Sequence, residues 1–294
     1  MLKIYLFRLL INLMPFFLWR GKTPAGLAVQ DINADTGSGT LRLRTYRPPG
    51  DGPFPVTLYF HGGGFVVGSV TSCDPICREI AAGAGHIVVS VNYRLAPEHA
   101  FPAAAEDALA ALDWLAAHGA ALGCDMNNVF VAGDSAGGNL AAVTAREARQ
   151  RQPGLLRGQL LVFPVTDHYC SGHDSFYQPG KRRAMGRRLM CWFWDRYYQH
   201  STVLAAGQYH HRLSTPLAMD DHRQLPATLL IVAGDDPLRD EGLAYGKKLQ
   251  DAGVEVQLSL YADDPHGFIG YMGPTASHRK GMNEIIAWLG RLRH

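Results

Sequence analysis

The chain has 294 residues, and its 47% hydrophobic content is enough to build one large α/β domain or two small ones. Its 28 basic and 26 acidic residues leave a formal net charge of +2, which argues against a protein that binds nucleic acid through phosphate contacts. Five cysteines, an odd number scattered along the chain, predict free thiols in a reducing compartment, and we expect a cytoplasmic protein. No grouping of cysteine and histidine has the spacing of a zinc site, so no metal is predicted.

Residues 1–20 are apolar and aromatic, with basic side chains among them. Arg8, Asn12 and Pro15 interrupt the run, which makes it a poor membrane-spanning helix. As a signal peptide it lacks a good cleavage site, since only residues 25–28 offer small side chains. The pattern favours a helix packed on the domain and leaves open an interfacial membrane helix or a signal peptide.

The next segments alternate between strand and helix patterns. Between residues 27 and 48, apolar and polar residues alternate on both sides of a Thr-Gly-Ser-Gly turn, which predicts a β-hairpin. Short, nearly continuous apolar runs then predict strands buried on both faces of a parallel sheet. They span 56–60, 86–93, 128–133, 158–163, 227–234 and 254–261. Helical patterns span 103–119, 136–150, 238–253 and 282–293. This alternation predicts an α/β fold with a mostly parallel central sheet, an antiparallel N-terminal hairpin and helices on both faces.

One long insertion, residues 168–224, holds no strand pattern and is rich in aromatic and basic residues. Insertions of this kind between strands are usually lids or binding loops, so we predict a helical cap. The chain is therefore divided into an N-terminal cap segment (1–40), an α/β domain (41–167 and 225–294) and the cap insertion.

A serine lies between a predicted strand and a predicted helix, in the pattern Gly133-x-Ser135-x-Gly137. In a nucleophile elbow this tight turn pushes the serine hydroxyl out above the sheet. The backbone N–H of Ala136 then lies at a helix N-terminus, where it stabilises negative charge. An ordinary glycine-rich turn stays open as an alternative, while the absence of a following Gly-Lys-Ser/Thr weakens a phosphate-binding loop.

Three consecutive glycines in the stretch HGGGF (61–65) follow the strand pattern at 56–60. Glycines there let another group approach the backbone closely, at a loss of chain entropy. Together with an elbow 70 residues downstream, they indicate a loop whose N–H groups hold the oxyanion of an acyl-transfer reaction.

A nucleophilic serine needs a base and an acid that orients the base. Asp235 and Asp236 directly follow the strand pattern at 227–234, and His266 follows the next one. The order serine, acid, histidine, with the last two after late strands, is typical of α/β hydrolases.

Several motifs together resemble the hormone-sensitive-lipase-like esterases, the bacterial HGGG/GDSAG group (family IV) of α/β hydrolases. They are HGGGFVVGS (61–69), YRLAPEHAFPAAAEDA (93–108), GDSAGGNLA (133–141), FPVTD (163–167), WFWDRYY (192–198) and GDDPLRDEGLAYGKKLQDAG (234–253). The resemblance runs from about residue 40 to the C-terminus.

The resemblance implies a serine carboxylic ester hydrolase that needs no cofactor and acts on a small-molecule ester, with a preference for short-to-medium acyl chains. It implies Ser135 as nucleophile, Asp236 as acid and His266 as base. The implied oxyanion donors are the N–H groups of Gly63, Gly64 and Ala136. A cap over the acyl pocket is implied as well, made from the N-terminal helices and the insertion.

Two features depart from the family's usual pattern: an unusually apolar N-terminus and a basic cap segment. The cap bases are Lys181, Arg182, Arg183, Arg187 and Arg188. A solvated helix face explains them most simply, and the sharper hypothesis is contact with an anionic membrane or an acidic acyl group. Homodimer formation also stays open. Rival functions are an amidase or lactonase with the same residues, a ligand-binding receptor on the same fold, and an interaction protein whose partner binds the cap.

Overall fold

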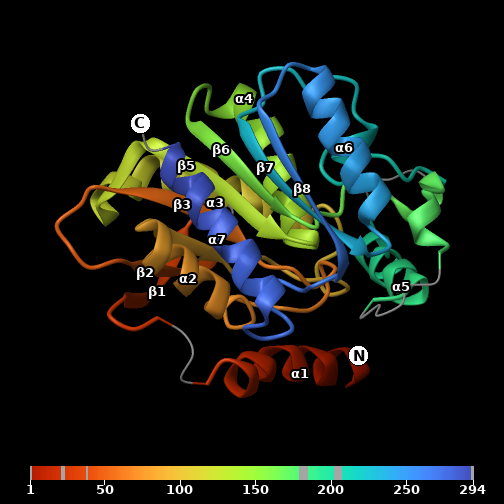
Figure 1. Ribbon diagram of the computed structural model, residues 1–294, viewed down its shortest axis with the longest axis horizontal. Helices are drawn as coiled ribbons and strands as arrows, with labels where there is room; N and C mark the ends of the chain where they lie inside the picture. The colour runs from red at the N-terminus through yellow and green to blue at the C-terminus, as the bar shows by residue number, and fades with distance from the viewer. Residues whose placement is uncertain (1, 21–23, 38, 179–184, 202–206, 293–294) are drawn as a thin grey trace.

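The computed structural model describes residues 2–20, 24–37, 39–178, 185–201 and 207–292. Within these ranges no helix combines the length and apolarity needed to cross a membrane. Figure 1 shows a central twisted sheet with helices on both sides and one N-terminal helix along the edge of the molecule.

The sheet has eight strands in the order β1-β2-β4-β3-β5-β6-β7-β8. Strand β1 pairs antiparallel with β2 and β2 with β4, and all later pairs are parallel. The strands are β1 (Ala28–Asp35), β2 (Thr40–Arg47), β3 (Phe54–Phe60), β4 (Ile87–Val91), β5 (Cys124–Asp134), β6 (Leu156–Val162), β7 (Ala227–Asp235) and β8 (Val256–Pro265). Five of the six apolar runs form buried central strands as predicted, because both faces of these strands are covered by helices. The sixth, 254–261, forms the edge strand β8, whose side chains are mostly half-buried or exposed.

Helices on the two faces of the sheet belong to two separate hydrophobic clusters. The first face carries α3 (Ala103–His118), α4 (Ala136–Arg151) and α6 (Arg239–Asp251), and the other carries α2 (Asp74–Ala84) and α7 (Ala276–Arg291). Figure 1 shows α2 and α7 in front of the sheet. The predicted mostly parallel α/β fold with an antiparallel N-terminal hairpin is confirmed.

The sequence reasoning missed helix α2, although Pro75 in its first turn and Gly85 at its end, in the left-handed conformation, are ordinary helix boundary signals. Its apolar positions face the sheet, but the segment is short and lies between two glycine-rich stretches. The strand β1 begins within the segment 1–40 that the sequence assigned to the N-terminal cap. The division into cap and α/β domain stays a prediction.

Two helices lie outside the layers, α1 (Leu2–Leu18) and α5 (Arg187–Tyr198). Both contribute to the same core cluster, α1 through Ile4 and α5 through Phe193 and Trp194. Phe7 of α1 stacks with Phe193 at a centroid distance of 6.3 Å, so the two helices contact each other.

Candidate active site

The structure brings four sequence motifs together at one edge of the sheet. Ser135 directly follows β5, Asp236 follows β7 and His266 follows β8, while residues 61–65 follow β3. These strands are parallel and lie close together in the order β3-β5-β6-β7-β8, so their carboxyl ends meet on the same side. Segments about 200 residues apart in the chain therefore supply one site.

Ser135 sits in a strained turn between β5 and α4, with φ 54° and ψ −118°. Two backbone hydrogen bonds fix this turn: Ser135 N–H donates to the Val162 carbonyl at 2.9 Å, and Val165 N–H donates to the Ser135 carbonyl at 3.0 Å. A positive φ is unfavourable for a residue with a Cβ. Ser135 keeps this strained conformation because the two hydrogen bonds to Val162 and Val165 hold the turn in place. The conformation is that of the predicted nucleophile elbow.

A chain of hydrogen bonds joins the three predicted triad residues. His266 Nε2 lies 3.0 Å from Ser135 Oγ, and His266 Nδ1 lies 2.6 Å from Asp236 Oδ2. The other carboxylate oxygen of Asp236 accepts the backbone N–H of Leu238 at 2.9 Å. All three side chains are buried, so water does not compete for these contacts.

The two candidate acids have different positions. The carboxylate that reaches His266 belongs to Asp236, which is fully buried. Asp235 is the last residue of β7 and pairs in register with Pro265. Asp236 is the first residue after the strand, in the turn that leads to α6, and its carboxylate is the one hydrogen-bonded to His266.

The three glycines of residues 61–65 each leave room for a neighbouring group. A Cβ on Gly62 would clash with Asp134 Oδ2, one on Gly63 with the Val67 carbonyl oxygen, and one on Gly64 with the Phe193 ring. Among the described residues, the backbone N–H groups of Gly63, Gly64 and Ala136 donate to no protein acceptor. The loop therefore packs closely without side chains of its own and presents N–H donors that the protein itself does not use, as an oxyanion site requires.

Asp134, the residue before the serine, has a contact that the sequence reasoning missed. Its Oδ1 accepts the Tyr59 hydroxyl at 2.7 Å and the Gly62 N–H at 3.1 Å, and the Tyr271 hydroxyl lies against the same glycine. Burial raises the pKa of Asp134, and the donated hydrogen bonds oppose the rise. Asp134 thus ties the glycine loop to the strand that carries Ser135. Its position inside the GDSAG motif is the signal that could have drawn attention to it.

Two further buried residues lie beside the triad. The ring of Phe163, whose φ is 34°, is 4.8 Å from the His266 ring, centroid to centroid. Glu241 accepts the backbone N–H groups of Thr166 and Asp167 at 2.7 and 3.1 Å, and burial raises its pKa well above the usual range. At the start of a helix a glutamate is ordinarily a solvated partner of the helix dipole, so the sequence alone gave no reason to select Glu241.

The basic cap lies only partly within the described chain. Lys181, Arg182 and Arg183 fall outside the described residues. Arg187 and Arg188, at the start of α5, are exposed, in agreement with a solvated helix face.

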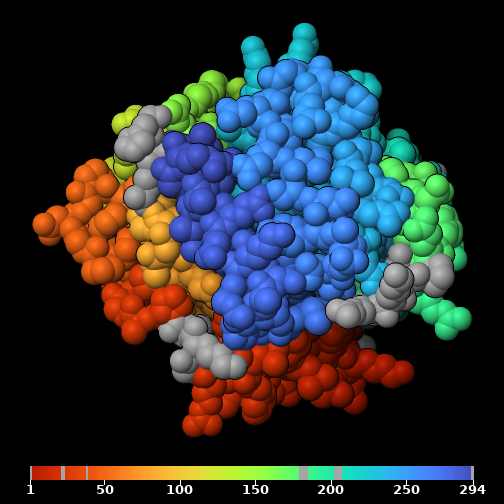
Figure 2. All heavy atoms as spheres, in the orientation of Figure 1, coloured from red at the N-terminus to blue at the C-terminus, as the bar shows by residue number. Residues whose placement is uncertain are grey.

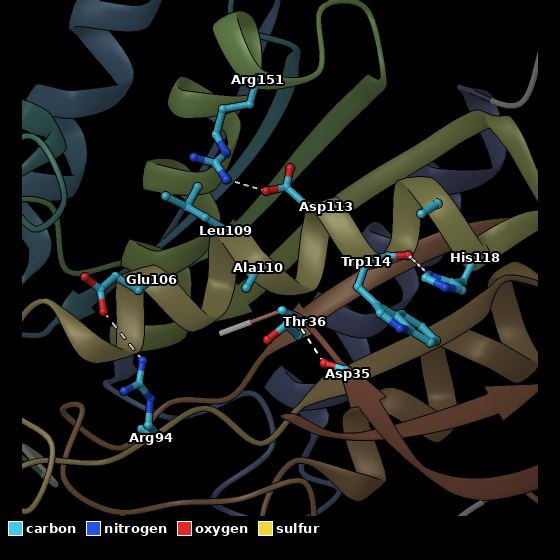
Figure 3. Close-up of a pocket in the computed structure, with 12 residues that line it drawn as sticks. Asp35, Thr36, Arg94, Glu106, Leu109, Ala110, Asp113, Trp114, His118 and Arg151 are labelled. Atoms are coloured by element: carbon cyan, nitrogen blue, oxygen red, sulfur yellow. Dashed lines mark hydrogen bonds and ion pairs between the residues drawn. The ribbon is translucent and has the colours of Figure 1, made fainter. Parts of the chain in front are cut away.

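A separate hollow of about 770 Å³ lies between the β1–β2 turn and α3 (Figure 3). Four of its charged side chains are paired: Arg94 lies 3.5 Å from Glu106, and Arg151 pairs with Asp113. None of the triad residues lines it. Nor, in the described ranges, is any group of three or more His, Cys, Asp or Glu side chains arranged to hold a metal ion.

Comparisons with known proteins agree with this geometry. Residues 57–270 match a family model described as the alpha/beta hydrolase fold. The chain is 39% identical to the esterase LipI of Mycobacterium tuberculosis, covering 91% of this chain and 83% of that protein. It is 40% identical to an ethyl acetate hydrolase of Pseudomonas putida, covering 85% and 78%. A crystallised esterase of Pyrobaculum calidifontis matches with a TM-score of 0.90 at 36% identity, covering 98% of this chain and 93% of that one.

Proposed function

The chain belongs to the α/β-hydrolase family, in its hormone-sensitive-lipase-like group, and is a carboxylic ester hydrolase, for which we propose Ser135, His266 and Asp236 as the catalytic triad. The observation that carries the proposal is the continuous hydrogen-bond chain from Asp236 through His266 to Ser135, each residue at the carboxyl end of a parallel strand.

In the proposed reaction, Ser135 Oγ attacks the ester carbonyl carbon while His266 Nε2 accepts the hydroxyl proton. Asp236 holds His266 in the tautomer with the proton on Nδ1 and stabilises the imidazolium that forms. The tetrahedral intermediate collapses as His266 returns the proton to the departing alcohol, which leaves an acyl-serine ester. Water then attacks this ester, with His266 again as the base, and the carboxylic acid is released.

The N–H groups of Gly63, Gly64 and Ala136 hold the negative oxygen of both tetrahedral intermediates in this proposal. Their support is the absence of another acceptor among the described residues and the position of Ala136 at the N-terminus of α4. Loss of one such donor lowers turnover by about 10²–10³-fold in other acyl-transfer enzymes. No step of this mechanism calls for a cofactor.

The substrates are small-molecule esters, and we propose a preference for short-to-medium acyl chains. The bulky side chains of α5, with Phe193 against the glycine loop, support a limited acyl pocket. The relative that is named for ethyl acetate hydrolysis supports short esters as well. Amide or lactone substrates would use the same residues, and membrane contact and homodimer formation stay predictions.

The experiment that tests the proposal is hydrolysis of p-nitrophenyl esters from acetyl to dodecanoyl by the wild type and by Ser135→Ala. We expect a maximum at octanoyl or shorter in the wild type, and a fall in kcat of about 10⁶-fold in the variant. Equal urea midpoints for the two proteins would show that the serine is not needed for folding. A Ser135→Ala variant that still turns over would refute the assignment, and a maximum at dodecanoyl would refute the chain-length preference.

A further inference from the structure

Most of the exposed apolar side chains of this protein lie on a single helix. Of the twelve large apolar side chains that are exposed among the described residues, eight belong to α1 and are between 41% and 84% exposed. We call them the outer face of α1: Leu2, Tyr5, Leu6, Leu9, Leu10, Leu13, Phe16 and Phe17. Figure 2 shows this helix along one border of the molecule, with one side free of the body. A contiguous apolar patch of this kind is rare on a monomer and marks an interaction surface.

The opposite face of α1 carries Arg8 and Asn12 together with Ile4, Phe7 and Ile11, which pack on the core, so this helix is apolar on both sides, unlike an ordinary surface helix. Arg8 donates to the Val66 carbonyl at 2.8 Å and to the Ala96 carbonyl at 2.9 Å, and it pairs with Glu98. Asn12, one helical turn later, accepts the hydroxyl of Ser69 at 2.7 Å. These polar contacts, together with the packing of Ile4, Phe7 and Ile11, hold α1 against the protein and leave its outer face exposed.

The C-terminal end of α1 is fixed as well. Trp19, which is buried, donates from its indole nitrogen to the Gly270 carbonyl at 3.1 Å and packs edge-on against His278. With Arg8 and Asn12, this makes three anchor points along about 25 Å of helix. The outer face is thus held in a constant orientation, and its exposure is not the consequence of a detached helix.

The charge around the outer face is basic. Residues 1–30 contain Lys3, Arg8, Arg20 and Lys22 and no acidic residue. Lys3 and Arg20 are exposed and lie near the two ends of α1. If two copies of the protein paired through this face, either helix orientation would bring base against base, with no acid from the face to compensate. An anionic surface complements the same arrangement.

We propose that the outer face of α1 is a docking surface for an anionic lipid bilayer. Its leucine and phenylalanine side chains enter the boundary between headgroups and acyl chains, and Lys3 and Arg20 contact lipid phosphates. Because α1 bonds to Val66, next to the glycine loop, and to Gly270, close to His266, docking brings the bilayer within about one helix diameter of the active-site loops. Esters dissolved in the membrane are then the substrates nearest the site, an extension that rests on the proposed function.

The test is co-sedimentation of the full chain with vesicles of phosphatidylcholine alone and of phosphatidylcholine mixed with phosphatidylglycerol. We expect strong binding to the mixed vesicles, weaker binding to the neutral ones, and a loss of the difference at high salt. The double variant Leu9→Gln/Leu13→Gln should bind the mixed vesicles at least about tenfold more weakly. The matched control Leu260→Gln changes a leucine of similar exposure, 47%, on β8 and should bind as the wild type does.

A second variant separates charge from apolar contact. Lys3→Gln/Arg20→Gln should lower binding to the mixed vesicles by about fivefold per residue, with little effect on neutral vesicles. Hydrolysis of dissolved p-nitrophenyl butanoate should be unchanged in all these variants, because none of the substituted side chains belongs to the proposed triad or its oxyanion loop. That assay reports the catalytic assignment independently of docking.

Three results would overturn the docking proposal. The first is equal vesicle binding by the wild type and Leu9→Gln/Leu13→Gln. The second is equally strong binding of the wild type to the neutral and the mixed vesicles. The third is a wild-type dimer in sedimentation velocity that becomes a monomer in Leu9→Gln/Leu13→Gln without any vesicle binding, which would assign the outer face to a second copy of the chain.

Discussion

The glycine loop at residues 61–65 is supported from two sides that differ in kind. From the core, the fully buried Asp134 accepts the Gly62 N–H, and Tyr59 holds the same carboxylate. From the outside, Arg8 of α1 donates to the carbonyl of Val66, with a side chain that water still reaches. The loop is thus in contact with the buried core through Gly62 and, at the adjacent Val66, with one of the most exposed helices of the molecule.

The two sides of the loop should differ in local stability. Contacts sheltered from water keep their full electrostatic strength, whereas half-exposed charged contacts are weakened by solvent and salt. We therefore expect the core side to set the catalytic geometry and the α1 side to open locally without unfolding the sheet. Substitutions on the two sides should separate these roles.

The largest effect should come from the core, at the acid. Asp236→Asn should lower kcat by about 10⁴-fold, because the amide no longer holds His266 in the productive tautomer. Asp235→Asn is the matched control, since the adjacent aspartate does not reach His266, and it should retain activity within about threefold. Measured kcat on p-nitrophenyl butanoate decides between the two. Full activity of Asp236→Asn would show that another group orients the histidine.

The next effect is a dependence of stability on pH that comes from His61, the first residue of the glycine loop. Burial lowers the pKa of His61 to about 4, against about 6.5 in the unfolded chain. Between these values the unfolded state binds the additional proton, so the stability contributed above pH 6.5 is lost as the pH falls towards 4. The loss amounts to about 3 kcal/mol. Urea midpoints across this range should fall less steeply for His61→Gln, and parallel curves for the two proteins would contradict the prediction.

A smaller effect is expected at Asp134, which acts on the loop through Gly62. Asp134→Ala removes the acceptor of two donors and should lower kcat by about 10–100-fold with little change in KM. Asp134→Asn keeps an acceptor oxygen and should recover most of the activity. A general packing defect would lower the urea midpoint of both variants equally, and the kcat of Asp134→Ala and Asp134→Asn would then not differ.

The smallest effect should come from the outside. Arg8→Met removes charge-assisted hydrogen bonds to two carbonyls, and we expect faster amide exchange in α1 and a global stability loss of about 1 kcal/mol or less. Arg20→Met changes an exposed arginine just after the end of the same helix and should leave the exchange of α1 unchanged. If Arg8→Met unfolds the sheet together with the helix, the two sides of the loop are not independent.

Much of this arrangement could be predicted from local patterns. Apolar runs located the parallel strands, and the order of Ser135, Asp236 and His266 followed from where each run ends. Their catalytic roles stay predictions, but the hydrogen bonds that join them match the expected order. The oxyanion loop was indicated by three glycines that no regular strand would favour.

The rest could not be predicted because it depends on pairs of residues far apart in the chain. The contact of Asp134 with Gly62 spans 72 positions, and Arg8 meets Glu98 across 90. No periodicity announces such a pair. Helix α1 shows the limit most clearly, because its composition favoured a packed helix and left open an interfacial helix or a signal peptide, and only the contacts of Arg8 and Asn12 show which face turns outward.

The anchoring of Trp19 has a consequence for the order of events during synthesis. Its hydrogen-bond partner, Gly270, follows it by 251 residues, whereas the partners of Arg8 and Asn12 follow within 90. Contacts so distant in sequence form late. The end of α1 near Trp19 therefore leaves the ribosome long before its anchor exists, and it stays open to other partners until the last strand and helix are in place.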